Sequence, residues 1–297
     1  MVVYVYMGEG ERGDRDRWEV GGGKGEGERG DRDRDKDRDK SEDGGVRWVP
    51  VLAGTGTAIP VLQVLAEEFG RLTGGTVHIE PSIGSTGGIA ALRDGRIDCA
   101  LVSRELKPEE QQDVAYIPFA LAPVVLAAGR DLPACHLDSD MLLALYSGAD
   151  RIWCDGGAVT VLLRETGDSA TAIFGQFFSG FADVHSQAVT ARTWRVLMTD
   201  QAMEQALTDS PRAVGLFDFG IMQIRNAGVH SVPVAGLVPR LESGGSPSYP
   251  LLRPLGFAVT ETPSGTLAEF ITFTRGTAGG EMLLRYGYVP IAEPLVK

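Results

Sequence analysis

The strongest constraint on the fold is an alternation of short apolar segments with amphipathic ones, which begins at Val49. The stretch VPVLAG is typical of a strand that ends at Gly54, and TVHIEPSI and IDCALVS predict two further strands. Helical spacing connects the apolar residues Ile59, Leu62, Leu65, Phe69 and Leu72, and a shorter helix is predicted over residues 89–92. Strand, helix, strand, helix and strand in this order predict an α/β protein with a parallel sheet.

Two long apolar segments that contain proline lie far apart in the sequence, at residues 116–129 and 249–260. Proline cannot donate a hydrogen bond to a sheet, so such segments suit strands that pass from one lobe to another. We therefore predict two lobes, each a mostly parallel sheet flanked by helices, joined by two crossing strands. Residues 47–119 and 256–297 are assigned to lobe I, and residues 120–255 to lobe II. A ligand is then expected in the cleft, at the carboxyl ends of the strands.

The remaining elements follow from the same patterns. Helices are expected at DSDMLLALYSGA, GDSATAIFGQFFSGFA and TDQAMEQALTDSP, with two more near the C-terminus. Strands are expected at AVTVLLRE and at AVGLFDFG, and the latter is predicted to run into a turn. The apolar stripe of the second of these helices is predicted to lie in the core and consists of Ile173, Phe174, Phe177, Phe178 and Phe181.

The first 46 residues consist largely of glycine and alternating charges. Such a segment cannot bury enough apolar surface to offset the entropy of ordering, so we predict a disordered tail over residues 1–46. The apolar run Met1–Met7 is too short for a signal peptide, and the sequence as written shows no export signal. The formal net charge of -12 argues against nucleic acid as a partner, and no apolar run approaches the roughly 20 residues of a membrane span.

The cysteines and histidines do not form a recognisable metal site, because C-x-x-C and paired histidines are both missing from the sequence. No metal or other cofactor is therefore expected. Cys99 lies in an apolar strand and is expected in the core, whereas Cys135 and Cys154 could pair in an oxidising compartment. The signatures of a P-loop, a nucleophile elbow and a zinc protease are absent as well, which favours a binding protein over an enzyme.

Four junctions between a strand and a helix carry glycine, hydroxyl and arginine side chains, at residues 54–58, 84–88, 103–104 and 164–171. Helix N-termini expose unpaired N–H groups at the positive end of the helix dipole. Glycine lets the backbone come close to a ligand, and arginine offers a fork of donors to an oxyanion. Each junction alone would be explained by caps and turns. Four of them on one face of a cleft predict an anion site.

In their order and spacing, these segments resemble the substrate-binding proteins of phosphate ABC transporters, which are type II periplasmic binding proteins. The resemblance extends over residues 49–291 and rests on GTGTAIPVLQVLAEEFGRLTG, IGSTGGIAAL, GRIDCALVSRELKPEE, IPFALAPVVLA, ALYSGADRIWCDG, LRETGDSATAIF, AVGLFDFG, YPLLRPLGFAV and GYVP. It implies a two-lobed monomer in the periplasm or another extracytoplasmic compartment. Such a protein would capture phosphate and deliver it to the membrane subunits of an ABC permease.

The resemblance also implies which residues hold the anion. Backbone N–H groups would come from Ala58 and Ile59, a hydroxyl from Ser85 and a guanidinium from Arg164, with residues 168–170 on a helix N-terminus beside it. The complete candidate set is Thr57, Ala58, Ile59, Ser85, Thr86, Ser103, Arg104, Arg164, Asp168, Ser169 and Ala170.

Three positions depart from the family pattern. Ala58 stands where a threonine is expected, Ser103 where an aspartate accepts the proton of phosphate in the best-known branch, and Asp168 where a serine is expected. One hypothesis is that Asp168 takes over the missing acceptor role and selects protonated phosphate over sulfate. The alternative is that Asp168 caps the helix with its side chain turned away from the ligand.

Two other functions stay open at the level of the sequence. A pocket of hydroxyl and amide donors also suits molybdate, tungstate or sulfate. The fold could also serve a sensor or scaffold outside transport, which the missing export signal and the charged N-terminal segment favour slightly.

Overall fold

The computed structural model of the protein describes residues 38–40, 46–226, 228–239 and 248–291. From Arg38 onward the chain forms one compact unit. Strands and helices alternate along most of this unit, which confirms the predicted α/β class.

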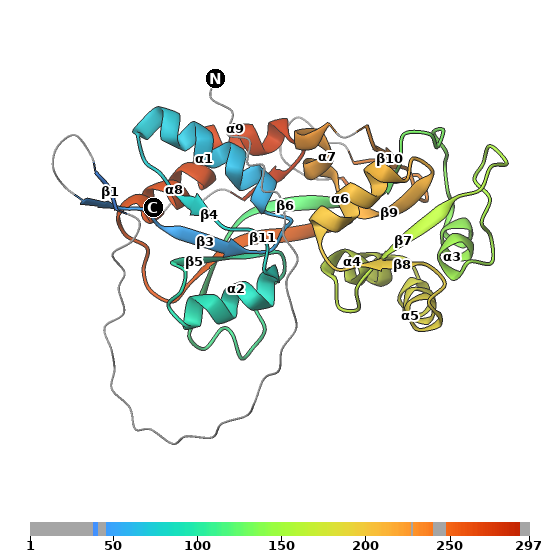
Figure 1. The fold of residues 1–297 in the computed structure, drawn as a ribbon, viewed down its shortest axis with the longest axis horizontal. Coiled ribbons are helices and arrows are strands. Elements are labelled where there is room, and N and C mark those ends of the chain that lie inside the picture. The colour runs from blue at the N-terminus through green and yellow to red at the C-terminus, as the bar shows by residue number, and fades with distance from the viewer. Residues whose placement is uncertain (1–37, 41–45, 227, 240–247, 292–297) are drawn as a thin grey trace, which may run out of the picture. The chain divides into compact units, whose positions relative to one another are not determined.

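Ten strands of the described part form one mixed sheet with the order β4-β3-β5-β11-β6-β9-β7-β8, and β10 and β12 pair with β6 (Figure 1). The strands β4, β3 and β5 are parallel to one another, as are β9, β7 and β8. The antiparallel strands β11 and β6 join these two groups. Their bounds are β3 (Val51–Gly54), β4 (His78–Ile79), β5 (Cys99–Val102), β6 (Ala115–Ala128), β7 (Thr160–Arg164), β8 (Arg195–Leu197), β9 (Ala213–Asp218), β10 (His230–Val232), β11 (Leu252–Val259) and β12 (Val289–Pro290).

Helices cover both faces of the sheet. Figure 1 shows α1, α8 and α9 on one face of β3, β4 and β5, and α2 on the opposite face. Their bounds are α1 (Ile59–Thr73), α2 (Gly84–Arg93), α3 (Ser139–Ser147), α4 (Ser169–Phe177), α5 (Phe181–Ala191), α6 (Asp200–Asp209), α7 (Phe219–Arg225), α8 (Gly265–Arg275) and α9 (Thr277–Arg285). Each parallel strand except β5, which is followed by β6, leads to a helix, and this places loop residues at the carboxyl edge of the sheet.

The two proline-bearing segments pair with each other as β6 and β11. β6 extends past this pairing and pairs with β9 along its C-terminal part, whereas β11 pairs with β5, so the two strands together link both parallel groups. The register of β6 and β11 shifts at Gly256, where any side chain would collide with the ring of Tyr116. The predicted crossing strands are therefore present, with glycine at the irregular position.

The buried apolar side chains gather in separate clusters on either side of the crossing strands. The largest cluster draws on residues 124–251, and a second draws on residues 52–122 together with 255–288. This separation agrees with two lobes. The boundaries assigned from the sequence, after residues 119 and 255, stay a prediction.

Three elements differ from the sequence prediction. α2 begins at Gly84 rather than near residue 89, because the small residues before that point already form its first turn. The aromatic stripe belongs to two helices, since α4 ends at Phe177 and α5 begins at Phe181, and Phe177 is 47% exposed rather than part of the core. β9 runs into helix α7 instead of a turn, because the Asp218 carboxylate accepts a hydrogen bond from the Ile221 N–H and caps that helix.

The tail predicted over residues 1–46 lies almost wholly outside the described residues. Near the end of this segment, strand β1 (Arg38–Lys40) pairs antiparallel with strand β2 (Val46–Trp48). In the ranges that the structure does describe, no helix is both long and apolar enough to cross a bilayer.

The cysteines behave as the sequence suggests. Cys99 is fully buried in β5. A disulfide bond joins Cys135 to Cys154, one on each side of α3.

Candidate functional site

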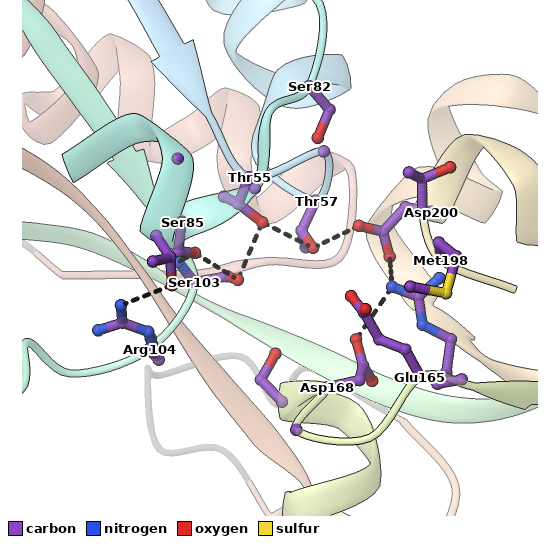
Figure 2. A pocket seen from close by; sticks show the side chains of 18 of the residues that line it. Thr55, Thr57, Ser82, Ser85, Ser103, Arg104, Glu165, Asp168, Met198 and Asp200 are labelled. Carbon is purple, nitrogen blue, oxygen red and sulfur yellow. Dashed lines mark hydrogen bonds and ion pairs between the residues drawn. The ribbon is translucent and has the colours of Figure 1, made fainter. Parts of the chain in front are cut away.

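A cavity of about 490 Å³ lies at the carboxyl edge of the sheet (Figure 2). Its wall includes residues 55–57 after β3, 103–104 after β5, 164–165 at the end of β7 and 198–200 after β8. The first turns of α2, α4 and α6 also line it. Because helix N-termini expose unpaired N–H groups, this edge attracts negative charge. All four junctions singled out in the sequence meet here.

Most of the candidate set from the sequence lines this cavity, namely Thr57, Ser85, Thr86, Ser103, Arg104, Arg164, Asp168 and Ser169. Ala58, Ile59 and Ala170 are not among the described residues of the wall, and their side chains are buried. Ala58 and Ile59 were expected to offer backbone N–H groups, and Ala170 to lie on the helix N-terminus beside the anion. The Ala170 N–H already donates to Asp168 Oδ1 at 3.0 Å. The ligand-binding role of all three stays a prediction.

A row of hydroxyl groups runs along one side of the cavity. Ser85 Oγ lies 3.4 Å from Ser103 Oγ, and Thr55 Oγ1 lies 2.9 Å from Ser103 Oγ and 3.3 Å from Thr57 Oγ1. Ser85 Oγ also accepts the backbone N–H of Ser103 at 3.2 Å. Hydroxyl protons can rotate, so this row can turn donors toward a ligand without adding charge.

Glycine explains how α2 comes close to this row. A Cβ on Gly88 would lie 2.9 Å from Gly54 Cα and 3.1 Å from Ala53 O, so no larger residue fits between α2 and the end of β3. Gly54 itself has φ of +149°, a conformation that side-chain-bearing residues rarely adopt. The glycines of this junction therefore bring the N-terminus of α2, with Ser85 and Thr86, to the cavity wall.

Arg164 is the charged centre of the opposite wall. It ends β7 and is 5% exposed. Its Nη2 donates to Asp168 Oδ2 at 2.9 Å and lies 3.7 Å from Asp200 Oδ1. Its Nη1 is buried and has no hydrogen-bond partner among the described residues. A buried donor without a partner is costly, so this N–H points to an acceptor that the chain does not itself supply.

Asp168 caps α4, as one of the two alternatives from the sequence has it, and it also lines the cavity. Its Oδ1 accepts the N–H groups of Ala170 and Thr171 and caps α4, while its Oδ2 faces Arg164 across the cavity wall. Burial opposes the charged form, but Arg164 and Arg253 outweigh burial and hold the pKa of Asp168 below its ordinary value. Asp168 is therefore a carboxylate that caps a helix and still lines the cavity.

Arg104 lies in the cavity wall and forms an ion pair with Glu110, which is not among the described residues of that wall. Its Nη1 and Nη2 donate to the two carboxylate oxygens of Glu110 at 2.7 and 2.8 Å. Hydrogen bonds from Arg104 are the main reason that the pKa of Glu110 falls to about 2. The pair holds the guanidinium in one orientation, with its Nη2 3.5 Å from Thr86 Oγ1.

Three charged residues of the wall, Glu165, Asp200 and Arg253, are absent from the candidate set, although Glu165 lies within one of the predicted junctions. Arg253, on β11, is 2% exposed and donates to Ser169 Oγ and to Asp218 Oδ2, each at 3.2 Å. Its Nε, like Arg164 Nη1, is buried without a hydrogen-bond partner in the described part of the chain. Asp200 begins α6 and accepts from Thr57 Oγ1 at 3.0 Å. Asp200 lies between a strand and a helix, as the other junctions do, so the same search of strand ends could have identified it. No local sequence pattern marks Arg253.

The charges of the wall balance. Among its described residues are three arginines, Arg104, Arg164 and Arg253, and three carboxylates, Glu165, Asp168 and Asp200. Helix N-termini, hydroxyls and guanidinium groups supply donors, and the carboxylates supply acceptors. Such a wall can bind a small oxyanion, and it suits an oxyanion that carries a proton to share with a carboxylate.

Comparison with known proteins identifies the family. Residues 48–276 match the PBP superfamily domain, which is most of the chain. The chain belongs to the periplasmic-binding-protein (PBP) superfamily. This membership confirms the expectation of a substrate-binding protein rather than an enzyme.

Individual relatives of this PBP are distant. The phosphate-binding protein PstS 2 of Streptococcus pneumoniae is 26% identical over 102 residues, which cover 34% of this chain and 35% of that protein. The matched region thus spans about a third of the length of this curated relative.

Solved structures confirm the type II fold of the PBP. A Clostridium perfringens protein assigned as a phosphate ABC transporter substrate-binding protein, solved with bound phosphate, is 20% identical with a TM-score of 0.65 over 82% of this chain and 100% of that chain. The periplasmic molybdate-binding protein of Azotobacter vinelandii is 16% identical with a TM-score of 0.55 over 81% and 98% of the two chains. At these identities the likeness concerns the fold and not the ligand.

Proposed function

We propose that this PBP captures phosphate in the cavity between its lobes and delivers it to the membrane subunits of an ABC importer. The observation that carries the proposal is the buried, unpartnered Nη1 of Arg164, a residue in the wall of a cavity that helix N-termini and hydroxyl groups also line. A tetrahedral oxyanion offers several acceptor oxygens at once. It can therefore satisfy a guanidinium N–H together with hydroxyl and amide donors from the other side of the cavity.

Phosphate is favoured over a fully deprotonated oxyanion because of the carboxylates in the wall. Sulfate and molybdate carry no proton at neutral pH, so they would meet Asp168 as an unrelieved like charge. The O–H group of hydrogen phosphate can donate a hydrogen bond to that carboxylate, whose lowered pKa keeps it an acceptor. We propose that Asp168 provides this selection, in place of the aspartate that Ser103 replaces.

The second candidate is a binder of molybdate or a related anion, which the hydroxyl row of Ser85, Ser103, Thr55 and Thr57 favours. Neutral donors of this kind accommodate any tetrahedral oxyanion. The proposal of phosphate rests on Asp168, whose carboxylate favours a protonated anion, and this outweighs the argument from the hydroxyl groups.

The location and working cycle belong to the same proposal. We infer an extracytoplasmic monomer whose lobes, residues 47–119 with 256–297 and residues 120–255, close around the anion by bending the crossing strands β6 and β11. The disulfide between Cys135 and Cys154 supports an oxidising compartment.

A thermal-shift panel of phosphate, sulfate, molybdate, tungstate and a phosphonate tests the proposal. A ligand that binds only the folded state raises the melting temperature by mass action, so the panel ranks the anions directly. We expect phosphate to give the largest shift. A larger shift with molybdate or tungstate would favour the second candidate, and no shift with any anion would overturn both.

A further inference from the structure

Asp200 lies in the cavity between two groups that the proposed ligand would use. Its Oδ2 accepts a hydrogen bond from Thr57 Oγ1 at 3.0 Å, and its Oδ1 lies 3.7 Å from Arg164 Nη2. The side chain is 12% exposed. Figure 2 shows the carboxylate of Asp200 pointing toward Thr57, and its other oxygen forms the ion pair with Arg164.

This bridge connects segments that are far apart in the chain. Thr57 precedes α1, and Asp200 begins α6, 143 residues later. The two segments also touch at Gly56, where a Cβ would lie 2.9 Å from Gln201 Oε1. The absence of a side chain at Gly56 therefore lets the start of α6 approach the loop after β3.

The side-chain cap of α6 does not depend on the carboxylate of Asp200. Thr199 caps α6, because its Oγ1 accepts the N–H of Ala202 at 3.1 Å. By contrast, Asp168 is held by two backbone N–H groups of α4 as well as by Arg164. Asp200 can thus swing away from the cavity by side-chain rotation, whereas Asp168 cannot leave without uncapping its helix.

We propose that Asp200 is an intramolecular anion that occupies part of the ligand subsite, and that an incoming oxyanion must displace it. The inference rests on the proposed function, because it assumes that Thr57 and Arg164 serve the ligand. Without a ligand the carboxylate accepts the hydrogen bond of Thr57, forms an ion pair with Arg164 and so links the two sides of the cavity. Binding then exchanges one anion for another, which lowers affinity and raises selectivity, because only a ligand that offers more hydrogen bonds than the carboxylate replaces it.

The inference predicts an effect opposite to that of an ordinary binding residue. Calorimetric titration of phosphate and of sulfate is carried out on the wild type, Asp200→Asn and Asp200→Ala. We expect both variants to bind both anions at least about tenfold more tightly, because a like charge close to the bound anion has been removed. Asp209→Asn is the matched control, since it removes the same charge from the exposed end of the same helix, and it should leave affinity unchanged.

The outcomes separate the inference from the function on which it rests. If the wild type binds phosphate and the Asp200 variants bind it equally or more weakly, the inference is overturned and the proposed function stands. Weaker binding would make Asp200 an acceptor for the proton of the ligand. If the two Asp200 variants bind an anion and the wild type does not, the inference is supported, because Asp200 then blocks the subsite completely. No binding by any of the proteins would overturn the proposed function and the inference with it, provided that thermal melting without ligand shows every variant folded.

Discussion

The Arg104–Glu110 pair beside the cavity should contribute stability that acid removes. Arg104 lowers the pKa of Glu110 from 4.5 to about 2 through its hydrogen bonds. One pKa unit corresponds to about 1.4 kcal/mol, so the shift sets an upper limit of about 3 kcal/mol. Arg104 is 25% exposed, and solvent screening reduces this figure. We expect Glu110→Gln to lower the free energy of unfolding by about 1–3 kcal/mol at pH 7.

The pH dependence follows from the direction of the shift. Because the pKa of Glu110 is lower in the folded state, its contribution is fully present above pH 4.5 and is lost as the pH falls toward 2. Urea unfolding at pH 7, 5 and 3.5 measures it. Glu109→Gln, at the exposed neighbouring position, is the control for the loss of one charge. The reasoning is refuted if the two variants are equally stable at pH 7, or if the deficit of Glu110→Gln does not shrink below pH 4.5.

Two further predictions concern the helices that begin at the cavity. Gly88→Ala should lower the free energy of unfolding by about 1–3 kcal/mol, because its Cβ would lie 2.9 Å from the backbone of β3. The control, Gly280→Ala in the more open surroundings of α9, should not lower the stability of the protein. Equal stabilities of the two variants in urea unfolding would contradict the close packing at Gly88. Asp168→Asn should reduce the preference for phosphate over sulfate in calorimetry. It should also cost about 1–3 kcal/mol of stability, because asparagine still caps α4 but removes the charge that pairs with buried Arg164. An unchanged preference would show that Asp168 only caps α4.

The sequence predicted the parts of the site that depend on local pattern. Residues 55–57, 103–104 and 164–165 follow strands, and the carboxyl ends of parallel strands meet at one edge, so their convergence followed from the order of elements. The start of α2 was placed too late because glycine is a poor helix former, while here Gly88 is required by the close approach to β3.

The missed features depend on tertiary contacts. Arg253 lies within an otherwise apolar strand, and only the crossing of β11 beside α4 places it against Ser169 and Asp218. Phe177 continues the helical spacing of its neighbours, but the break before α5 leaves it exposed. The charge balance of the cavity likewise requires Asp200, which comes from a junction that the sequence pattern marked only as a helix.

The most direct test of the account is a calorimetric titration of phosphate into the wild type and Arg164→Ala, with the exposed Arg130→Ala as control. The wild type should bind one phosphate per chain. Arg164→Ala should bind at least tenfold more weakly, since removing one partner of a buried charge-assisted contact costs roughly 2–5 kcal/mol. Arg130→Ala should bind as the wild type does. Equal affinity of folded Arg164→Ala and wild type would contradict the claim that this cavity is the phosphate site.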